Sequence, residues 1–329
     1  MSMRVESAGL LTSIQDSGRT GFRHLGVGVA GALDSHSLVI ANLLVGNAAD
    51  AAVLEITLAG PTLVFECAAC IAICGAEIDA GIGAQRIPGW RRIDIPAGSR
   101  IKFGACRRGA RAYLAVAGGF AVARVLGSAS TDLRAGFGGH AGRALKAGDR
   151  IGIRGGFAPR ATQVEIDRRW IDPAPDLDFA QPCRVRLLPG LDALADADAL
   201  FAIPWRVEAA SNRQGLRLHG NRDATRLPRA EGGEPASEPV MPGTLQLPPA
   251  GSPILLLQDA QTHGGYPRIG HAIAADLPRL AQLRPGESVH FLPCTPAIAK
   301  QLLDAQRQRL ARMAIAIARP DRSNDACRP

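Results

Sequence analysis

The sequence has few aromatic residues, few lysines and no long apolar run. Aromatic residues make up 4% of the 329 residues, against 37 glycines and 23 prolines, a balance typical of many short strands joined by tight turns. No apolar run reaches the length of about 20 residues that a membrane-spanning helix needs. The first residues also lack the apolar segment of a secretory signal peptide. We therefore expect a cytoplasmic protein with no membrane partner.

Positive charge is carried almost entirely by arginine. The formal net charge is +8 and the sequence pI is about 9.6, but the lysines are Lys102, Lys146 and Lys300 alone. The arginines are scattered along the chain, and no basic stretch is interleaved with aromatic residues on which bases could stack. We therefore expect no nucleic-acid partner.

Several catalytic signatures are absent as well. The sequence has no G-x-x-x-x-G-K-[ST] phosphate loop, so this chain cannot bind ATP through that motif. It also has neither H-E-x-x-H nor G-x-S-x-G, the signatures of zinc proteases and of serine hydrolases with a nucleophile elbow.

Seven cysteines are present, three of them in Cys67-x-x-Cys70-x-x-x-Cys74, which resembles metal-ligand spacing. The residues around them are apolar, and the alternation of a strand would put Cys70 and Cys74 on one face and Cys67 on the other. No second pair follows at a zinc-ribbon distance. We interpret these cysteines as buried thiols and expect no metal site.

The strand-rich pattern divides into two halves. Short apolar stretches recur with glycine- and proline-containing turns between them, which predicts a mainly β protein with a few helices. A Gly- and Pro-containing stretch near the middle predicts a connection. We expect a first β half over residues 1–155, the connection over 156–181, a second β half with a final helix over 182–318, and a tail over 319–329.

Three helices are predicted from their end signals. Asp34 is placed to cap a helix over Ser35–Val45, and Gly46 follows as the residue after its end. Asp276 is placed to cap a short helix that has proline in its first turn. A cap followed by proline starts the last helix, over Thr295–Ile317.

Two polar residues lie inside apolar stretches. Asn42 lies within the first helix, where its amide needs a hydrogen-bonding partner. Glu55 lies within Val53–Leu58, which we expect to form a hairpin with Thr62–Glu66. Its carboxylate either faces solvent or is buried with a partner, and the pattern favours the exposed position.

The most distinctive stretch is Ile254–Ala275, ILLLQDAQTHGGYPRIGHAIAA. A buried strand leads into a polar loop with two consecutive glycines, and another apolar stretch follows. Gly264 and Gly265 would let backbone N–H groups converge on a ligand, and Arg268 could supply a planar fork for a carboxylate or phosphate. An ordinary hairpin with a polar tip is the alternative. Two other turns, Gln15–Arg19 and Ser211–Gly215, have the same polar, glycine-containing character.

Six stretches together resemble the allophanate hydrolase subunit 2 or biotin-dependent carboxyltransferase family, which includes a component of the bacterial ATP-dependent 5-oxoprolinase. They occur in the family's order and cover nearly the whole chain. The matching segments are Gly9–Asp34, Ala41–Asn47, Leu54–Phe65, Ser211–Gly220, Ser237–Gly251 and Gln261–Gly286.

The resemblance implies a cyclophilin-like β-barrel architecture in two halves. It also implies a B-type partner of the allophanate hydrolase subunit 1 type, an active site shared with that partner, and a third, A-type component of the LamB/YcsF type. The implied reaction is the ATP-dependent ring opening of 5-oxo-L-proline to L-glutamate. Related enzymes instead move a carboxyl group from carboxybiotin to a urea or amide nitrogen, so biotin belongs only to that alternative. A non-catalytic regulator of a sensor kinase system is a third alternative.

Site residues follow from the matched motifs and the loops that carry them. The catalytic candidates are Gln261, Thr262, His263 and Arg268. The substrate-binding candidates are Gly264, Gly265, Tyr266, Ser211, Asn212, Arg213, Asp16, Arg19 and His24.

Two positions depart from the family pattern. The family loop is usually QTTGGYP, whereas this chain has His263 in place of the second threonine, and Gln214 stands where methionine is common. His263 could act as a general acid or base near neutral pH, or could be a neutral replacement at the rim of the loop.

Overall fold

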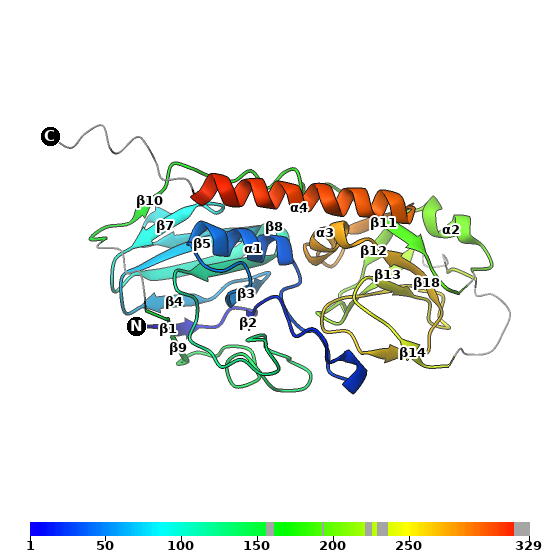
Figure 1. Cartoon of the computed structure of the whole chain (residues 1–329), viewed down its shortest axis with the longest axis horizontal. Helices are drawn as coiled ribbons and strands as arrows, with labels where there is room; N and C mark the ends of the chain where they lie inside the picture. The colour runs from blue at the N-terminus through cyan, green and yellow to red at the C-terminus, as the bar shows by residue number, and fades with distance from the viewer. Residues whose placement is uncertain (156–160, 193, 221–225, 229–235, 319–329) are drawn as a thin grey trace.

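The computed structural model describes residues 1–155, 161–192, 194–220, 226–228 and 236–318. It shows a large β-sheet and a β-barrel side by side, with one long helix lying along both (Figure 1). The predicted tail over 319–329, which contains Cys327, and the first five residues of the predicted connection lie outside the described residues. The protein is mainly β, as predicted.

The first half is built on a ten-stranded antiparallel sheet. Its main path runs β10-β7-β5-β8-β4-β1-β9, and β3 and β2 branch from β8. The longest pair in this sheet joins β5 to β8. The strands are β1 (Ser2–Ser7), β2 (Leu11–Gln15), β3 (Val53–Thr57), β4 (Thr62–Phe65), β5 (Ala69–Ile82), β6 (Gln85–Arg86), β7 (Arg92–Ile95), β8 (Arg100–Val116), β9 (Arg150–Gly152) and β10 (Glu165–Ile166).

Of the two β-barrel halves that the resemblance implied, the second is a closed barrel, whereas the first is the ten-stranded sheet. Seven strands close in the order β11-β18-β15-β16-β13-β12-β19, and β14 and β17 form a separate two-stranded sheet. The strands are β11 (Cys183–Pro189), β12 (Trp205–Val207), β13 (Gly215–Gly220), β14 (Glu238–Pro239), β15 (Thr244–Gln246), β16 (Ile254–Leu256), β17 (His263–Gly264), β18 (Arg268–Ala272) and β19 (Ser288–Pro293).

The helices connect and cover these two units. The α-helices are α1 (Ser35–Leu44), α2 (Ala197–Ala202), α3 (Leu277–Ala281) and α4 (Pro296–Ala318), and the short 3₁₀ helices are η1 (Arg23–Leu25) and η2 (Ala274–Asp276). The predicted cap of α1 is confirmed, because the Asp34 side chain accepts a hydrogen bond from the Ser37 amide. Asn42 donates to the carbonyls of Ala49 and Ala51, which satisfies its buried amide.

Three large apolar clusters form the cores of the two units. One lies within the first sheet, one fills the barrel, and one lies between α1 and the sheet. Cys70 and Cys74 belong to the cluster under α1, whereas Cys67 packs against the cluster within the sheet. The predicted alternation of these cysteines is therefore confirmed.

Three predictions about local structure are wrong. Val53–Leu58 and Thr62–Glu66 do not form a hairpin, because β3 and β4 both pair with the 17-residue β8, at different stretches of it. Glu55 is 1% exposed instead of facing solvent, because an arginine from the other half pairs with it. Asp276 does not cap α3 and instead forms an ion pair with Arg186.

Candidate functional site

The polar stretch of the second half forms a loop outside the barrel, which we call the site loop (Leu257–Pro267). It joins β16 to β18, but these strands do not pair with each other, so the stretch is not the tip of a hairpin. Instead, β17 within the loop pairs with β14, and the amide of Val240 donates to the carbonyl of Thr262 at 3.0 Å. The loop is therefore held by backbone hydrogen bonds on one side.

The site loop rests on a buried glutamine that is not among the predicted site residues. Gln246 is 1% exposed; its side chain accepts from Gln261 at 3.3 Å and donates to the carbonyl of Tyr266 at 3.4 Å. A Cβ atom on Gly264 would lie 2.8 Å from Gln246 Nε2, so a side chain at this position would have to displace the Gln246 amide. The available signal was a glutamine between Leu245 and Leu247, where a buried amide must have a partner.

Arg268 is held by acidic residues of the same chain. Its backbone amide donates to Asp192 at 2.7 Å, its Nε lies 3.4 Å from the same carboxylate, and its guanidinium also forms an ion pair with Glu238. The guanidinium fork that could bind a carboxylate or phosphate of a ligand is thus engaged by two carboxylates of the same chain. In this arrangement, Arg268 positions β14 against the start of β18.

Thr262, His263 and Tyr266 form the outward side of the site loop. His263 and Tyr266 are exposed, and Thr262 Oγ1 lies 3.0 Å from His263 Nδ1. The hydroxyl and the imidazole can therefore exchange a hydrogen bond while the second ring nitrogen stays free to face a ligand. Among the predicted catalytic residues, this pair has the access and the chemistry for proton transfer.

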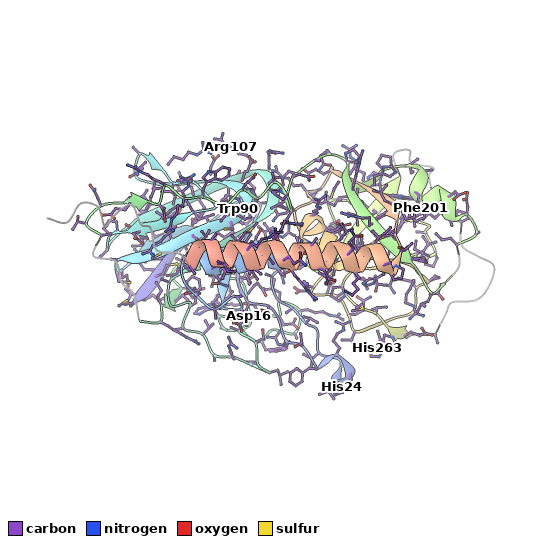
Figure 2. All side chains as sticks on the ribbon, turned by 45° about the horizontal axis from the view of Figure 1, so that its top comes forward. Asp16, His24, Trp90, Arg107, Phe201 and His263 are labelled. Atoms are coloured by element: carbon purple, nitrogen blue, oxygen red, sulfur yellow. The ribbon has the colours of Figure 1, made fainter. Side chains whose placement is uncertain are left out.

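A turn of the first half reaches the site loop through η1. The Arg23 guanidinium donates to the carbonyl of Gln261 at 3.0 Å and also to that of Val240. The adjacent His24 is exposed, and Figure 2 shows His24 and His263 on the same side of the molecule. The two halves therefore contribute to one surface.

Asp16 and Arg19 lie deeper in the same turn. The Asp16 carboxylate accepts hydrogen bonds from Ser128, Ser130 and the amides of Ala129 and Gly18. Burial acts to raise the pKa of Asp16, but these hydrogen bonds outweigh it and lower the pKa on balance. Asp16 is thus a buried anchor that ties the turn to the loop at residues 128–130.

Arg19 has the largest unmet hydrogen-bonding capacity near the site. It is 1% exposed and donates through Nη2 to the carbonyl of Ser130 at 2.6 Å. Its guanidinium lies over the Phe137 ring at 4.5 Å, and Nε and Nη1 are buried without a partner. Burial lowers the pKa of Arg19, whereas nearby Asp132, Asp16 and Asp259 act to raise it.

Arg213 forms the centre of a buried ion-pair network between the halves. Nε and Nη2 donate to Asp259 at 2.8 and 2.9 Å, and Nη1 pairs with Glu55. Glu55 also accepts from Tyr113 at 2.9 Å. Because the Arg213 side chain is 4% exposed and every nitrogen of its guanidinium has a partner, it locks the halves together rather than facing a ligand.

The remaining predicted residues form the rim of the turn before β13. Asn212 is exposed and accepts from the Gln214 amide at 2.8 Å, whereas Ser211 is half-buried and accepts from the Arg217 amide. The structure thus brings the site loop and His24 to one surface, and it places Asp16, Arg19 and Arg213 beneath it as supports. Four cavities found in the described part of the chain are lined by none of these residues.

No group of three or more His, Cys, Asp or Glu side chains within the described ranges is arranged to hold a metal ion. In the same part of the chain, no helix has the length and apolar character needed to cross a bilayer.

Comparison with known proteins gives two bacterial relatives of similar length, both named as the C component of 5-oxoprolinase. The chain is 41% identical to the Escherichia coli protein over 298 residues, which cover 89% of this chain and 91% of that protein. It is 35% identical to the Haemophilus influenzae protein, over 85% of this chain and 87% of that protein.

Solved structures include larger proteins that contain a similar unit. The urea amidolyase of K. lactis matches with a TM-score of 0.82 and 28% identity, over 94% of this chain but 20% of that one. A protein designated TTHA0988 matches with a TM-score of 0.76 and 37% identity, over 88% of this chain and 55% of that one. The family model described as carboxyltransferase domain, subdomain A and B, matches residues 25–293. The chain therefore belongs to the carboxyltransferase domain family, whose model comprises subdomains A and B.

Proposed function

We propose that this chain is the C-type component of an ATP-dependent 5-oxoprolinase, which opens the ring of 5-oxo-L-proline to give L-glutamate. The observation that carries the proposal is the 41% identity to the C component of 5-oxoprolinase from Escherichia coli, which extends over nearly the full length of both chains. A match of this extent covers most of both halves.

The chemistry fits an exposed surface that a partner completes. Cleavage of an amide requires stabilisation of negative charge on the carbonyl oxygen and a proton for the leaving nitrogen. The site loop offers Thr262 and His263 for proton transfer, and its glycines allow a ligand to approach the backbone closely. Arg19 lies beneath this surface with two unpartnered donors. Because the surface is open, the remaining walls would come from another chain.

We infer that the partners are a B-type homologue of allophanate hydrolase subunit 1 and an A-type protein of the LamB/YcsF type. The relatives named as the C component of 5-oxoprolinase belong to a multi-subunit enzyme, which supports partners of some kind. This chain has no P-loop, so ATP would bind to a partner or at a shared interface. We place the complex in the cytoplasm.

A second candidate is the carboxyltransferase part of a biotin-dependent urea or amide carboxylase. It is favoured by the structural match to urea amidolyase, which has a TM-score of 0.82 over 94% of this chain. In that reaction, carboxybiotin and the carboxylase that forms it would be supplied by separate proteins.

The test uses site-loop variants in the complete three-protein complex. Gln261→Ala and His263→Ala should lower the rate of L-glutamate formation by at least about tenfold, because positioned proton transfer typically contributes about 10²–10⁴-fold. Assembly, checked by size-exclusion chromatography, should be unchanged. Wild-type turnover by both variants would refute a catalytic role for the site loop. Urea-dependent consumption of carboxybiotin, without 5-oxoproline cleavage, would favour the second candidate.

A further inference from the structure

Exposed apolar side chains lie beside the candidate site on segments of both halves. Leu25, the last residue of η1, is 67% exposed, and Met241, which follows β14, is 55% exposed. Tyr266 of the site loop is 41% exposed. We call these residues the apolar rim. A single exposed apolar side chain is common, but a group of them on adjoining segments marks a surface that binds another protein, and methionine and tyrosine are enriched in such interfaces.

The segments that carry the apolar rim are in direct contact. The Arg23 guanidinium donates to the carbonyl of Gln261 at 3.0 Å and also to that of Val240, so η1 lies against the residues before Met241 and against the site loop. Figure 1 shows η1 in dark blue at the lower edge of the molecule, where it projects from the first half beside the barrel. Leu25 is therefore displayed on a projecting turn that both halves hold in place.

The base of this turn is closed by tight backbone contacts. The amide of Arg19 donates to the carbonyl of Val29 at 2.8 Å. Gly31 has a φ of +89°, and a Cβ atom there would lie 2.8 Å from the amide nitrogen of Gly18. No residue of η1 itself is buried. A side chain displayed in this way by an ordered turn loses little conformational freedom when a partner binds it.

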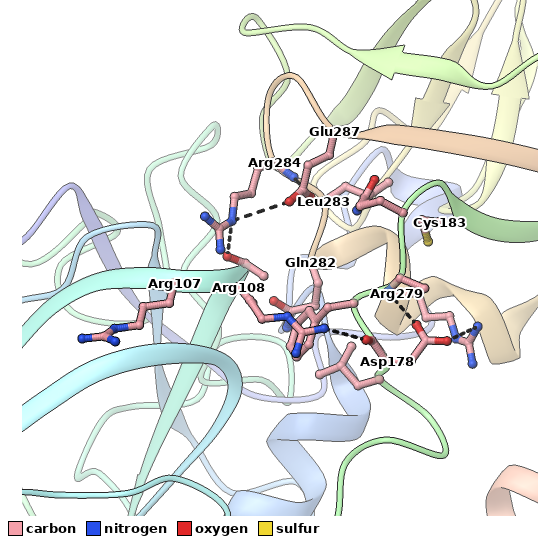
Figure 3. Close-up of a pocket in the computed structure, with 14 residues that line it drawn as sticks. Arg107, Arg108, Asp178, Cys183, Arg279, Gln282, Leu283, Arg284 and Glu287 are labelled. Carbon is pink, nitrogen blue, oxygen red and sulfur yellow. Dashed lines mark hydrogen bonds and ion pairs between the residues drawn. The ribbon is translucent and has the colours of Figure 1, made fainter.

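Arg23 carries a positive charge that the chain does not balance nearby. No ion pair joins Arg23 to an acidic side chain among the residues that the structure describes, and burial alone lowers the pKa of Arg23. Arginines elsewhere between the halves differ, because Arg279 pairs with Asp178 and Arg284 with Glu287 (Figure 3). A protein that covers the apolar rim would therefore gain affinity from a carboxylate placed near Arg23.

We propose that the apolar rim is the docking surface of the B-type partner, which meets it with an apolar socket bordered by carboxylates. Leu25 enters the socket, and Met241 and Tyr266 pack at its edge. Because His24 and His263 lie on the same side of the molecule (Figure 2), a protein seated on the rim also covers the open side of the candidate site. This inference rests on the proposed function, which requires a second chain at this surface.

The test measures binding of the full chain to the B-type homologue by isothermal titration calorimetry. Leu25→Glu and Met241→Glu should each raise the dissociation constant by at least about thirtyfold, the loss typical of a residue at the centre of an interface. Leu25→Lys should raise it less than Leu25→Glu, because glutamate meets the carboxylates of the partner with a like charge. Equal effects of lysine and glutamate would refute the acidic border of the socket.

Leu10→Glu is the matched control. Leu10 is 65% exposed, close to the value for Leu25, but it precedes β2, whereas Asp16 follows the other end of that strand. This variant should bind the partner like the wild type. Thermal unfolding followed by circular dichroism should give the wild-type melting temperature for Leu25→Glu, because the side chain that is replaced is not part of a core.

Turnover separates docking from the proposed function. With the B-type homologue in excess, the Leu25→Glu complex should regain the wild-type rate of L-glutamate formation, because Leu25 takes part in docking and not in the chemistry. The docking surface is overturned, and the proposed function stands, if the wild-type complex forms L-glutamate while both rim variants bind as tightly as Leu10→Glu. A wild-type chain that neither binds the B-type homologue nor supports L-glutamate formation would refute the proposed function and the docking surface together.

Discussion

At the scale of single residues, the main finding concerns Arg213, which was predicted to bind substrate. In the structure its guanidinium forms buried ion pairs with Glu55 and Asp259. Arg213 lies in a polar, glycine-containing turn, a pattern that favours both binding sites and buried supports. The local sequence shows neither Glu55 nor Asp259, because their pairing depends on contacts between the halves. The exposed position predicted for the Glu55 side chain is wrong for the same reason, because its partner Arg213 lies in the other half.

Arg213→Ala should destabilise the chain strongly. The substitution leaves two buried carboxylates without their cation, for which a loss of about 3–5 kcal/mol in the free energy of unfolding is typical. Urea unfolding monitored by circular dichroism would measure it. Arg217→Ala, at an exposed position on β13, should change stability by no more than about 0.5 kcal/mol. A loss below about 1 kcal/mol for Arg213→Ala would contradict the assigned role.

Asp149 should contribute stability that depends on pH. Hydrogen bonds from Arg143, and a further one from the Lys146 amide, lower the pKa of Asp149 against the opposing effect of burial. Because the pKa is lower in the folded chain, the contribution is complete above the unfolded pKa of about 3.9 and is lost as pH falls through the folded value.

Asp149→Asn should therefore destabilise the chain by about 1–2 kcal/mol at pH 7 and by less at about pH 2.5, where part of the contribution has been lost. Urea unfolding at both pH values gives the comparison. An equal loss at the two values would exclude the charge as the cause.

The buried thiols should resist alkylation in the native chain. Burial is the largest cause that raises the pKa of Cys70 and Cys183 to about 12 and of Cys106 to about 11. Since the thiolate is the reactive form, iodoacetamide at pH 8 should leave these three unlabelled until denaturant unfolds the chain. Mass spectrometry of the peptides would show it; rapid labelling of all three in the native chain would rule out the assigned burial.

At the scale of elements, the sequence predicted what depends on local signals. The cap at Asp34, the helix after Thr295 and the alternation around Cys70 all follow from spacing, and the structure confirms them. Local sequence signals could not predict that β8 is long enough to pair with both β3 and β4. Nor could they predict that Gln246 lies beneath the site loop. Its hydrogen bonds join β15 to residues of the site loop that are 15 and 20 positions away in the sequence.

Gly264→Ala should impair the site loop while the barrel stays intact. The added Cβ would meet Gln246 Nε2 at 2.8 Å, and Gln246 is too confined to move without disturbing Gln261. We expect turnover of the complex to fall by about tenfold or more, with a melting temperature within about 4 °C of the wild type. Gly155→Ala is the control, because nothing lies within 4 Å of its Cβ position. Equal turnover by both variants would show that the loop tolerates displacement.

At the scale of the whole molecule, a buried polar seam fixes the two halves relative to each other. Arg213 and Gln282 of the second half bond to Glu55 and Asp34 of the first, while α4 lies along both (Figure 1). This rigid arrangement presents η1 and the site loop on one open surface. The family resemblance, rather than residue periodicity, predicted that such a surface needs partners.

The most direct test of the central claim is L-glutamate formation from 5-oxo-L-proline and ATP by the three-protein complex. The rate is measured with the complete complex, and again with this chain omitted and the other two proteins at the same concentrations. We predict ATP-coupled L-glutamate formation in the first case and loss of that activity in the second. An unchanged rate without this chain would contradict its proposed role as the C-type component.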